Sequence, residues 1–556
     1  MSKVMLTMVT AALLCGAAQA LTSEEIAGAL GIDPSVGTFS TSGDAEWFVE
    51  TTTNSHAGAT CMRSGAIPSK DEWSTTKLTM TVDVKEPSRL YFWYKTSFFN
   101  NPDYYGRFTV SSDAFSARRY SEAWYRNQIV LLPGRRVINW EFARRSSGSG
   151  SNCVWLDDVS LVPISTNKAT AVGVTNIVCS QRTPWNGKVD IDYTVTSDDP
   201  EADIWVYPVG YDNDTNTSMA PRALEGDGVG APVKAGTHRM TWTVTDDYPN
   251  FNSTAFTVKM TALTGAAPYM VVDLSGGVDA LSYPVTYLSS VPAGGWGDEY
   301  RGTKMVFRLI PPGHFMMGSP SDEPGHSDRE DLHAVVLTRP FYIGVFECTQ
   351  KQYELVMGAK PSYYKGDYRP VEQVSYNDIR GSVNGAGWPT HNQVDANSFM
   401  GRLRSKANML FDLPTEAEWE YACRAGTSTG LNSGKEYDNG ANCSEVARWN
   451  GNKNDGKGGY SGAHTKVGSY RANAWGLYDM HGNVWEWCRD LWCYRGLGFS
   501  GVVNPKGETG DTDSRVVKGG GCRDNTRLRS AQRGYCGKDS RGDSGGFRVF
   551  CSPVAQ

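Results

Sequence analysis

Residues 78–85 alternate strictly between apolar and polar side chains. The apolar members are Leu78, Met80, Val82 and Val84, and the polar ones are Thr79, Thr81, Asp83 and Lys85. Because successive side chains of a β-strand point to opposite faces, this period of two predicts a strand with one buried face. Shorter strand-like runs follow up to residue 163, with clusters of Asn, Pro, Gly and Ser between them. The segment 21–163 is therefore predicted to be an all-β sandwich or jelly roll.

Two runs in this segment resemble bacterial jelly-roll modules of the broad meprin-type or concanavalin-like kind. They are Leu90-Tyr-Phe-Trp-Tyr94 and Gly150-Ser-Asn-Cys-Val-Trp-Leu-Asp-Asp-Val159. Cys61 and Cys153 are the only cysteines between residues 21 and 163. In an exported protein, where disulfides persist, we expect these two to form a bond that closes the sandwich.

A second all-β unit is predicted over residues 168–265. Its strand-like runs cover residues 189–195, 204–207, 238–244 and 255–260, a spacing typical of a seven-strand immunoglobulin-like or fibronectin-like sandwich. Cys179 and Trp205 resemble the immunoglobulin cysteine and tryptophan, but no second cysteine follows in this unit. Cys179 is therefore the best candidate for an unpaired thiol, either a buried cysteine or a bridge between two chains. Residues 266–302, rich in Gly, Pro and Ser, are predicted to be a linker.

The first twenty residues have the composition of an export signal. Lys3 supplies the positive start, residues 4–17 the short apolar run, and Ala18-Gln19-Ala20 the small-x-small cleavage site. We expect a secreted or periplasmic protein after cleavage, with a lipoprotein anchor at Cys15 as the less favoured alternative. No run of about 18 apolar residues exists elsewhere, so no membrane span is expected. The formal net charge of −6 argues against a nucleic-acid-binding protein, which would carry a basic face.

One helix of the C-terminal part can be placed firmly from its capping residues. In Leu413-Pro-Thr-Glu-Ala-Glu-Trp-Glu-Tyr-Ala-Cys423, Thr415 is the predicted N-cap and Glu418 is the third helical residue. This is a capping box, in which the hydroxyl and the carboxylate each accept a hydrogen bond from an otherwise unpaired backbone N–H. A second helix is predicted over residues 350–357.

Eight ordered motifs beyond residue 303 closely resemble the formylglycine-generating enzyme family, also called sulfatase-modifying factor domains. They cover residues 310–319, 341–353, 361–364, 369–375, 413–423, 473–488, 518–520 and 546–549. The longest is Asn473-Ala-Trp-Gly-Leu-Tyr-Asp-Met-His-Gly-Asn-Val-Trp-Glu-Trp-Cys488. The resemblance runs over 303–552 and implies a loop-rich α/β fold related to C-type lectins. The whole chain is thus predicted to be multidomain, with two all-β sandwiches before this domain.

The resemblance implies one of several activities, and the cysteines discriminate between them. Family oxidases convert a sulfatase cysteine to formylglycine with oxygen, copper and a pair of thiols five residues apart, whereas other members only bind ligands. In the corresponding segment here, Lys518 to Arg533, the second thiol position falls on Asn525 and the first is missing. Cys522 is the only thiol in this segment, at a place where non-catalytic relatives carry Trp. It is the one candidate catalytic residue, and a disulfide with Cys536 or Cys493 is its alternative role.

The resemblance also implies a calcium site and a disulfide. The calcium ligands match Asp479, Gly482, Val484 and Glu486, a set of two carboxylates and two backbone carbonyls that suits a hard cation. Capping of turns by the two carboxylates is the alternative. A second family calcium site needs an Asp where Gly458-Gly459-Tyr460 stands, so it is not expected.

The family disulfide would join Cys423 and Cys551, although Cys551 lies two residues later than the family position. On a strand a shift of two residues keeps the same face. The sequence does not fix the pairing of the other cysteines of the C-terminal part, which include Cys443 and Cys488.

Two further patterns carry no expected function. Arg541-Gly-Asp-Ser-Gly-Gly546 contains a trypsin-like string, but no histidine lies in the setting that a serine protease would need. His326 and His333 flank an acidic run without a third ligand at metal-binding spacing.

Two hypotheses for the function therefore remain. The first is an exported binding or accessory protein whose C-terminal domain binds a peptide, a protein or a glycan. The second is an oxidase that activates sulfatases with copper.

Overall fold

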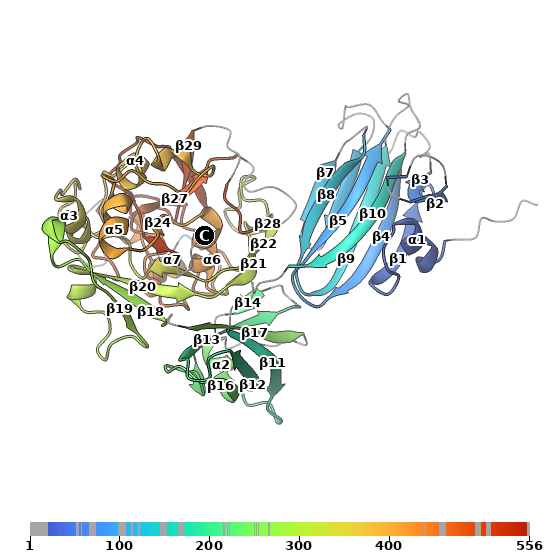
Figure 1. The fold of residues 1–556 in the computed structure, drawn as a ribbon. Coiled ribbons are helices and arrows are strands. Elements are labelled where there is room, and N and C mark those ends of the chain that lie inside the picture. Colours follow the sequence, from blue (N-terminus) through green and yellow to red (C-terminus); the bar gives the residue numbers. More distant parts are fainter. Residues whose placement is uncertain are drawn as a thin grey trace, which may run out of the picture. The chain divides into compact units, whose positions relative to one another are not determined.

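The computed structural model describes residues 21–552, apart from a set of segments and single positions. These are 52–54, 57, 66–73, 98–106, 113–114, 120–122, 145–152, 165–171, 215–216, 220, 222, 249–250, 252, 254, 265–266, 439, 455–462, 495–501 and 508–512. The predicted export signal and Gly458-Gly459-Tyr460 therefore lie outside the described residues. The chain divides into two compact units. The first takes most of residues 1–161, and the second takes Val162–Gln556 with two short stretches, Val84–Arg89 and Gln128–Gly134 (Figure 1).

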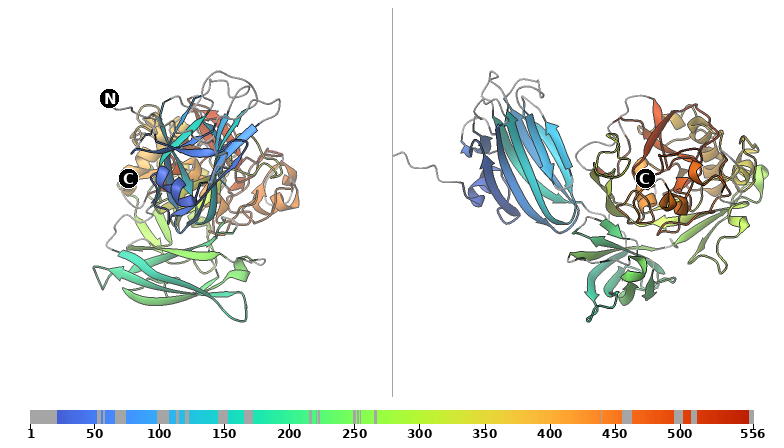
Figure 2. Two further views of the ribbon diagram at one scale, coloured as in Figure 1. Left: turned by 90° about the vertical axis from the view of Figure 1, so that its right-hand side faces the viewer. Right: turned by 180° about the vertical axis from the view of Figure 1, so that it is seen from behind.

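The first segment contains two five-stranded sheets that lie face to face (Figure 2). One sheet has the order β1 (Gly37–Gly43), β4 (Ser74–Val84), β9 (Gly134–Arg144), β6 (Arg107–Ser112) and β7 (Phe115–Arg119). The other has the order β2 (Trp47–Glu50), β3 (Cys61–Ser64), β10 (Val154–Pro163), β5 (Ser88–Thr96) and β8 (Tyr125–Leu131). Burial alternates residue by residue along β4 and β5, so the prediction of a mostly β segment is confirmed.

One helix of the first segment was not predicted. Helix α1 (Ser23–Ala29) begins at Thr22, whose hydroxyl accepts from the Glu25 N–H while the Glu25 carboxylate accepts from the Thr22 N–H. This is the same capping box that located a helix in the C-terminal part, and it stands in the sequence just after the expected cleavage site.

The second β segment has seven strands among the residues the structure describes. Four form one sheet, β11 (Val172–Gln181), β12 (Lys188–Ser197), β16 (Gly236–Thr243) and β15 (Leu224–Gly226), and three form another, β14 (Thr217–Met219), β13 (Ile204–Asp212) and β17 (Phe256–Thr264). A single helical turn, α2 (Val244–Asp247), follows β16. The buried indole of this segment is Trp242 rather than the expected Trp205, which is only partly buried. Cys179 is half-buried with a free thiol, and burial raises its pKa to about 11.

The segment expected to be a linker, 266–302, contributes two strands to the C-terminal domain. Strands β18 (Tyr269–Asp273) and β19 (Val285–Leu288) extend a sheet that continues with β20 (Lys304–Ile310), β23 (Phe341–Gly344), β32 (Phe550–Cys551) and β24 (Phe411–Asp412). The apolar run Met270, Val271 and Val272 is buried against β20. Packing of a short apolar run thus outweighs the flanking Gly and Pro that suggested a linker.

The rest of the C-terminal domain consists of short elements joined by long loops. Its remaining strands are β21 (Gly313–Met317), β22 (His333–Leu337), β25 (Ala447–Arg448), β26 (His481–Gly482), β27 (Trp485–Leu491), β28 (Val502–Val503), β29 (Ser514–Lys518), β30 (Arg533–Gly537) and β31 (Gly545–Gly546). The helices are α3 (Gln350–Met357), α4 (Tyr376–Arg380), α5 (Phe399–Ala407), α6 (Glu416–Arg424) and α7 (Ala441–Val446), with the short 3-10 turns η1 (Gly277–Asp279), η2 (Asp298–Tyr300), η3 (Gly385–Gly387) and η4 (Asn450–Asn452). Both predicted helices form, as α3 and α6, and the Thr415–Glu418 capping box is present. None of the described helices is long and apolar enough to span a membrane.

Buried ion pairs hold the loops of this domain together. The Arg529 guanidinium contacts the carboxylates of Glu323 and Glu330, each at 2.7 Å, although about 200 residues separate the partners in the sequence. Arg533 binds both oxygens of Glu416, at 2.5 and 3.0 Å. A loop without regular backbone hydrogen bonds needs such side-chain partners for its buried polar groups.

Candidate functional site

The segment that carries catalytic thiols in the family follows a four-stranded sheet. The order of this sheet is β30, β29, β27 and β31. At the end of β29 the chain turns through Gly519 and Gly520, whose φ angles are +91° and +76°. A Cβ on Gly520 would lie 2.1 Å from the carbonyl oxygen of Arg527, so only glycine allows this close return of the loop. The turn delivers Cys522 into the interior.

Cys522 lies in a setting that suppresses thiol chemistry. It has no exposed surface, and its backbone N–H donates to the carbonyl of Asn483 at 2.9 Å. Burial raises the pKa of its thiol to about 12, although the Arg448 and Arg523 charges act in the opposite direction. Reactive cysteines have a lowered pKa and some exposure, because the thiolate is the nucleophile and the metal ligand.

Asn525, at the second thiol position, has a structural role. Its side-chain oxygen accepts from the Asn450 amide at 2.8 Å, and its carbonyl accepts from the Tyr437 hydroxyl at 3.2 Å. These bonds tie the loop after β29 to two distant segments of the domain.

The alternative disulfide partners of Cys522 lie toward the other end of the β29–β30 hairpin. Cys536 pairs in register with Arg515, three residues before Lys518 at the end of β29, and Cys522 comes four residues after Lys518. Three strand positions span about 10 Å, so Cys536 lies about 10 Å along the sheet from the end of β29 at which the loop to Cys522 begins. Cys493 is close to this far end, because its carbonyl accepts from Arg533 at 3.0 Å and its neighbour Trp492 donates a backbone hydrogen bond to Ser514.

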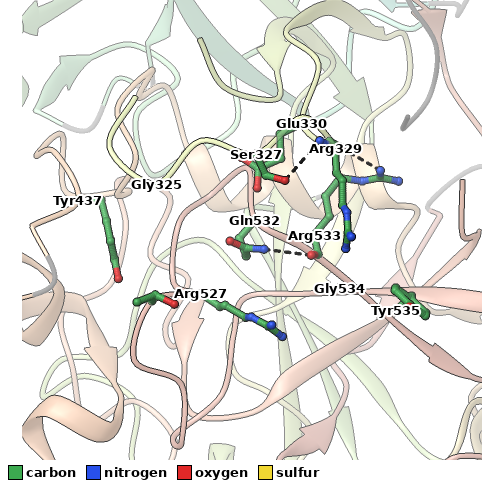
Figure 3. Close-up of a pocket in the computed structure, with 11 residues that line it drawn as sticks. Gly325, Ser327, Arg329, Glu330, Tyr437, Arg527, Gln532, Arg533, Gly534 and Tyr535 are labelled. Carbon is green, nitrogen blue, oxygen red and sulfur yellow. Dashed lines mark hydrogen bonds between the residues drawn. The ribbon is translucent and has the colours of Figure 1, made fainter. Parts of the chain in front are cut away.

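A pocket of about 740 Å³ opens beside β30 (Figure 3). Its lining residues come from three distant stretches of the chain and are Gly325, Ser327, Arg329, Glu330, Tyr437, Thr526, Arg527, Gln532, Arg533, Gly534 and Tyr535. A smaller groove of about 260 Å³ shares Arg527, Gly534 and Tyr535 with this pocket. Its other walls include Val374, Trp485, Trp487, Val517 and Cys536.

The residues expected to bind calcium lie close together in the interior, and one carboxylate oxygen of Asp479 accepts no hydrogen bond from the described residues. Asp479 is a non-glycine residue in the left-handed region, with φ of +55°. Its Oδ2 accepts from the Gly468 N–H at 2.6 Å, while its Oδ1 is buried without a hydrogen-bond partner among the described residues. Burial raises the pKa of this carboxyl to about 6. An orphaned buried carboxylate oxygen is the expected trace of a cation site.

Glu486 is more fully engaged. Its two oxygens accept from Arg548 Nε and Nη2, both at 2.6 Å, and one of them also accepts from the Trp419 indole at 2.6 Å. A carboxylate offers about four lone-pair positions, so one position remains for a cation. Gly482, with φ of +73°, packs against the Arg448 carbonyl, and a Cβ there would lie 2.2 Å from that oxygen.

A third carboxylate in this cluster was missed by the sequence analysis. Glu347 has no exposed surface, and it accepts from the Asn483 amide at 2.5 Å and from the Val484 N–H at 3.1 Å. Burial and the charges of Asp479 and Glu486 raise its pKa well above the usual value. The motif around residues 341–353 contained Glu347, but nothing in its spacing linked it to residues 479–486. Within the described residues no three His, Cys, Asp or Glu side chains form a ready-made metal cage, so a cation here would rely on backbone carbonyls as well.

The four cysteines expected to form disulfides are free thiols in the structure. Trp155 pairs with Arg63 between β10 and β3, and continuing this register places Cys61 opposite Asp157, four residues from Cys153. Four strand positions span about 13 Å, beyond the Cα separation of a disulfide.

The two cysteines of the second expected pair belong to different hydrophobic clusters. The Cys423 sulfur contacts Ser530 Oγ at 3.7 Å and His481 Nε2 at 3.8 Å in one hydrophobic cluster, whereas Cys551 belongs to another. This pairing, taken from the family, stays a prediction.

The two patterns without an expected function have structural partners. Arg541 forms an ion pair with Asp378 at 2.7 Å. His326 contacts the Ser319 hydroxyl at 2.8 Å, and the buried His333 contacts the Asp331 carbonyl at 2.6 Å.

Comparisons with known proteins found relatives of the C-terminal domain. A family model described as "Sulfatase-modifying factor enzyme 1-like domain" matches residues 298–552. The "Chaperone protein LppX" of Paenibacillus barcinonensis is 32% identical over 247 residues, covering 38% of this chain and 80% of that protein. The formylglycine-generating enzyme of Streptomyces coelicolor is 30% identical over 295 residues, covering 45% of this chain and 89% of that protein. Among solved structures, PvdO from Pseudomonas aeruginosa is 28% identical, with a TM-score of 0.35, and covers 44% of this chain and 94% of its own. Through its C-terminal domain the chain belongs to the formylglycine-generating enzyme, or sulfatase-modifying factor, family.

Proposed function

We propose that this chain is an exported binding or accessory protein whose sulfatase-modifying-factor domain does not act as an oxidase. Family membership alone leaves both roles open, because curated relatives are named both as formylglycine-generating enzymes and as a chaperone. The number and accessibility of the thiols in this domain therefore distinguish an oxidase from a binding protein.

The observation that carries the proposal is the burial of Cys522 beside a missing second thiol. Formylglycine synthesis in the family uses two thiols that bind copper and exchange electrons, and both tasks need accessible thiolates. Here the single thiol has a pKa of about 12 and no exposed surface. The partner position holds Asn525, whose side chain is engaged with Asn450.

The two β segments fit the role of attachment modules. They are proposed to be a jelly-roll-like sandwich over 21–163 and an immunoglobulin-like or fibronectin-like sandwich from residue 168, both following a cleaved export signal. In this arrangement the C-terminal domain offers its pocket and groove beside β30 to a ligand outside the cell.

Calcium is the proposed cofactor, with a structural role. Asp479 Oδ1, the remaining position on Glu486 and the carbonyls of Gly482 and Val484 would hold it. The ion would balance the buried carboxylates of Glu347, Asp479 and Glu486, three negative charges that face the Arg548 guanidinium and, at Asp479, also the charge of Arg301. Calcium would thereby stabilise the loop that also supplies Asn483 and Trp485 to the Cys522 segment.

A copper(I) titration tests the proposal at the thiol itself. The full chain and its Cys522→Ser variant are titrated against a competing chelator of known affinity. We expect the same copper uptake from both proteins, because the Cys522 thiol stays protonated and buried. One equivalent of tightly bound copper(I) that is lost in Cys522→Ser would contradict the proposal.

A further inference from the structure

The pocket and the groove beside β30 are neighbours that share part of their lining. Arg527, Gly534 and Tyr535 line both. Tyr535, on the edge strand, is 52% exposed, and its ring stacks on Trp492 at 4.7 Å. In Figure 3, Tyr437 and Tyr535 lie on opposite sides of the view, and Arg527 lies between them.

The charged residues of the pocket do not cancel one another. Both oxygens of Glu330 accept from Arg529, which lies outside the pocket lining, at 2.7 and 2.8 Å. The guanidinium of Arg533 is likewise bound to Glu416. Glu330 is thus paired with Arg529, which Glu323 also contacts, and Arg533 is paired with Glu416.

The net charge of the pocket lining then depends on its other two arginines. No ion pair of either Arg329 or Arg527 is found among the described contacts, and Arg329 instead lies over the Tyr494 ring at 4.8 Å. Asp524 feels the charge of Arg527, but its carboxylate is bonded to the Trp485 indole and the Gly521 N–H, and it lines neither cavity. The pocket is therefore basic in a chain whose net charge is −6.

The groove next to it is apolar and borders a strand edge. Val374, Trp485, Trp487 and Val517 supply its hydrophobic wall. A Cβ at position 534 would lie 2.9 Å from the Trp485 ring, so Gly534 lets this indole pack directly on the strand backbone. In the described sheet β30 is an edge strand that pairs only with β29. Edge strands present backbone groups that an extended peptide can pair with.

We propose that this surface binds an extended acidic peptide. Its backbone adds to the edge of β30, an apolar side chain enters the groove, and one or two carboxylates lie between Arg329 and Arg527. The inference rests on the proposed binding function and names its ligand class. The same charges would repel the arginine of the sulfatase-type Cys-x-Pro-x-Arg motif, so the surface selects against the substrate of a family oxidase. An acidic glycan would use the arginines but not the strand edge, which is why a peptide is favoured.

The test measures the binding of three fluorescent decapeptides to the full chain by anisotropy. The peptides share one leucine and differ only in a pair of adjacent residues, which are Glu, Gln or Lys. We expect the Glu peptide to bind at least tenfold more tightly than the Gln peptide, and the Lys peptide to bind more weakly still. Raising the salt from 0.05 to 0.5 M should weaken only the Glu peptide, because exposed charges are screened.

Two variants locate the site, one that reverses a charge and one that removes a ring. Arg527→Glu should abolish the preference for Glu over Gln, and Tyr535→Ala should weaken all three peptides. Lys365→Glu, an exposed reversal outside both cavities, is the matched control and should change nothing. Arg527 is exposed. Tyr535 is 52% exposed but its ring stacks on the buried Trp492 at 4.7 Å, so the melting temperature of Tyr535→Ala is compared with that of the wild type before binding is measured.

The outcomes separate this inference from the proposed function. Equal binding of the Glu and Gln peptides, or tighter binding of the Lys peptide, overturns the acidic preference while a binding role stands. Binding of sulfated dextran without binding of any peptide overturns the peptide assignment. Oxidation of a cysteine-containing peptide by the same preparation would overturn the proposed function itself.

Discussion

Asp490 is predicted to make the stability of the C-terminal domain depend on pH. Its side chain is fully buried on β27, where Oδ2 accepts from the Glu416 N–H at 2.8 Å and Oδ1 has no hydrogen-bond partner among the described residues. Burial, and next to it the charge of Glu416, raises the pKa of this carboxyl from 3.8 to about 7. The folded protein therefore holds a proton that the unfolded chain releases at much lower pH.

The size of the effect follows from the two pKa values. Because the folded pKa is the higher one, the proton stabilises the folded state at low pH, and this contribution is lost as the pH rises toward 7. Each unit between the pKa values corresponds to about 1.4 kcal/mol. Between pH 5 and pH 8 the loss from this one group should therefore be about 3 kcal/mol, after which the curve flattens.

The Asp490→Asn variant isolates this contribution, since its amide oxygen still accepts from Glu416 but carries no proton equilibrium. Urea unfolding is followed at pH 5, 6, 7 and 8 through pulsed hydrogen exchange of the 485–491 segment. The stability difference between the wild type and the variant should fall by about 3 kcal/mol from pH 5 to pH 8. The exposed Asp539→Asn serves as control and should give a constant difference. Parallel pH profiles for the wild type and Asp490→Asn would refute the reasoning.

Three further predictions concern the metal, the buried ion pairs and the thiols. Chelation of calcium should lower the melting temperature of the wild type but not that of Asp479→Asn. An ion at 100 times its Kd stabilises the folded state by about 2.7 kcal/mol, and the chelator removes this contribution. An unchanged melting temperature of the wild type would count against the calcium site. Arg529→Met should lower the free energy of unfolding by about 3–5 kcal/mol, since it leaves two buried glutamates without their cation. The exposed Arg541→Ala is the control and should lower it by less than about 1 kcal/mol. Equal losses in the two variants would contradict the prediction. Iodoacetamide should label Cys536 well before Cys522 in the native protein, as read by peptide mass spectrometry, and the reverse order would show an accessible Cys522.

Local signals in the sequence predicted the elements that depend on local physics. The strands around residues 78–84 follow from a period of two, and helix α6 follows from the Thr415–Glu418 capping box. Both need only interactions within a few residues. The order of motifs beyond residue 303 identified the family and directed attention to Cys522 and Asp479.

Features that depend on distant contacts were not predictable in this way. Strand β18 was taken for a linker because its partner β20 lies 35 residues further on. Glu347 joins Asp479 and Glu486 only through the tertiary fold, and no spacing in the sequence links them. The charge of the pocket was also not predictable, because it depends on the distant partners of two lining residues, Arg529 for Glu330 and Glu416 for Arg533.

The most direct test of the central claim is a peptide-oxidation assay. The full chain, supplied with copper(I), oxygen and a thiol reductant, is incubated with a peptide that carries the Cys-x-Pro-x-Arg core, and the product mass is read after aldehyde trapping. Because Cys522 is buried with a pKa of about 12 and Asn525 replaces its partner, the peptide cysteine should remain unchanged. Formation of the formylglycine aldehyde, and its loss in Cys522→Ser, would contradict the account.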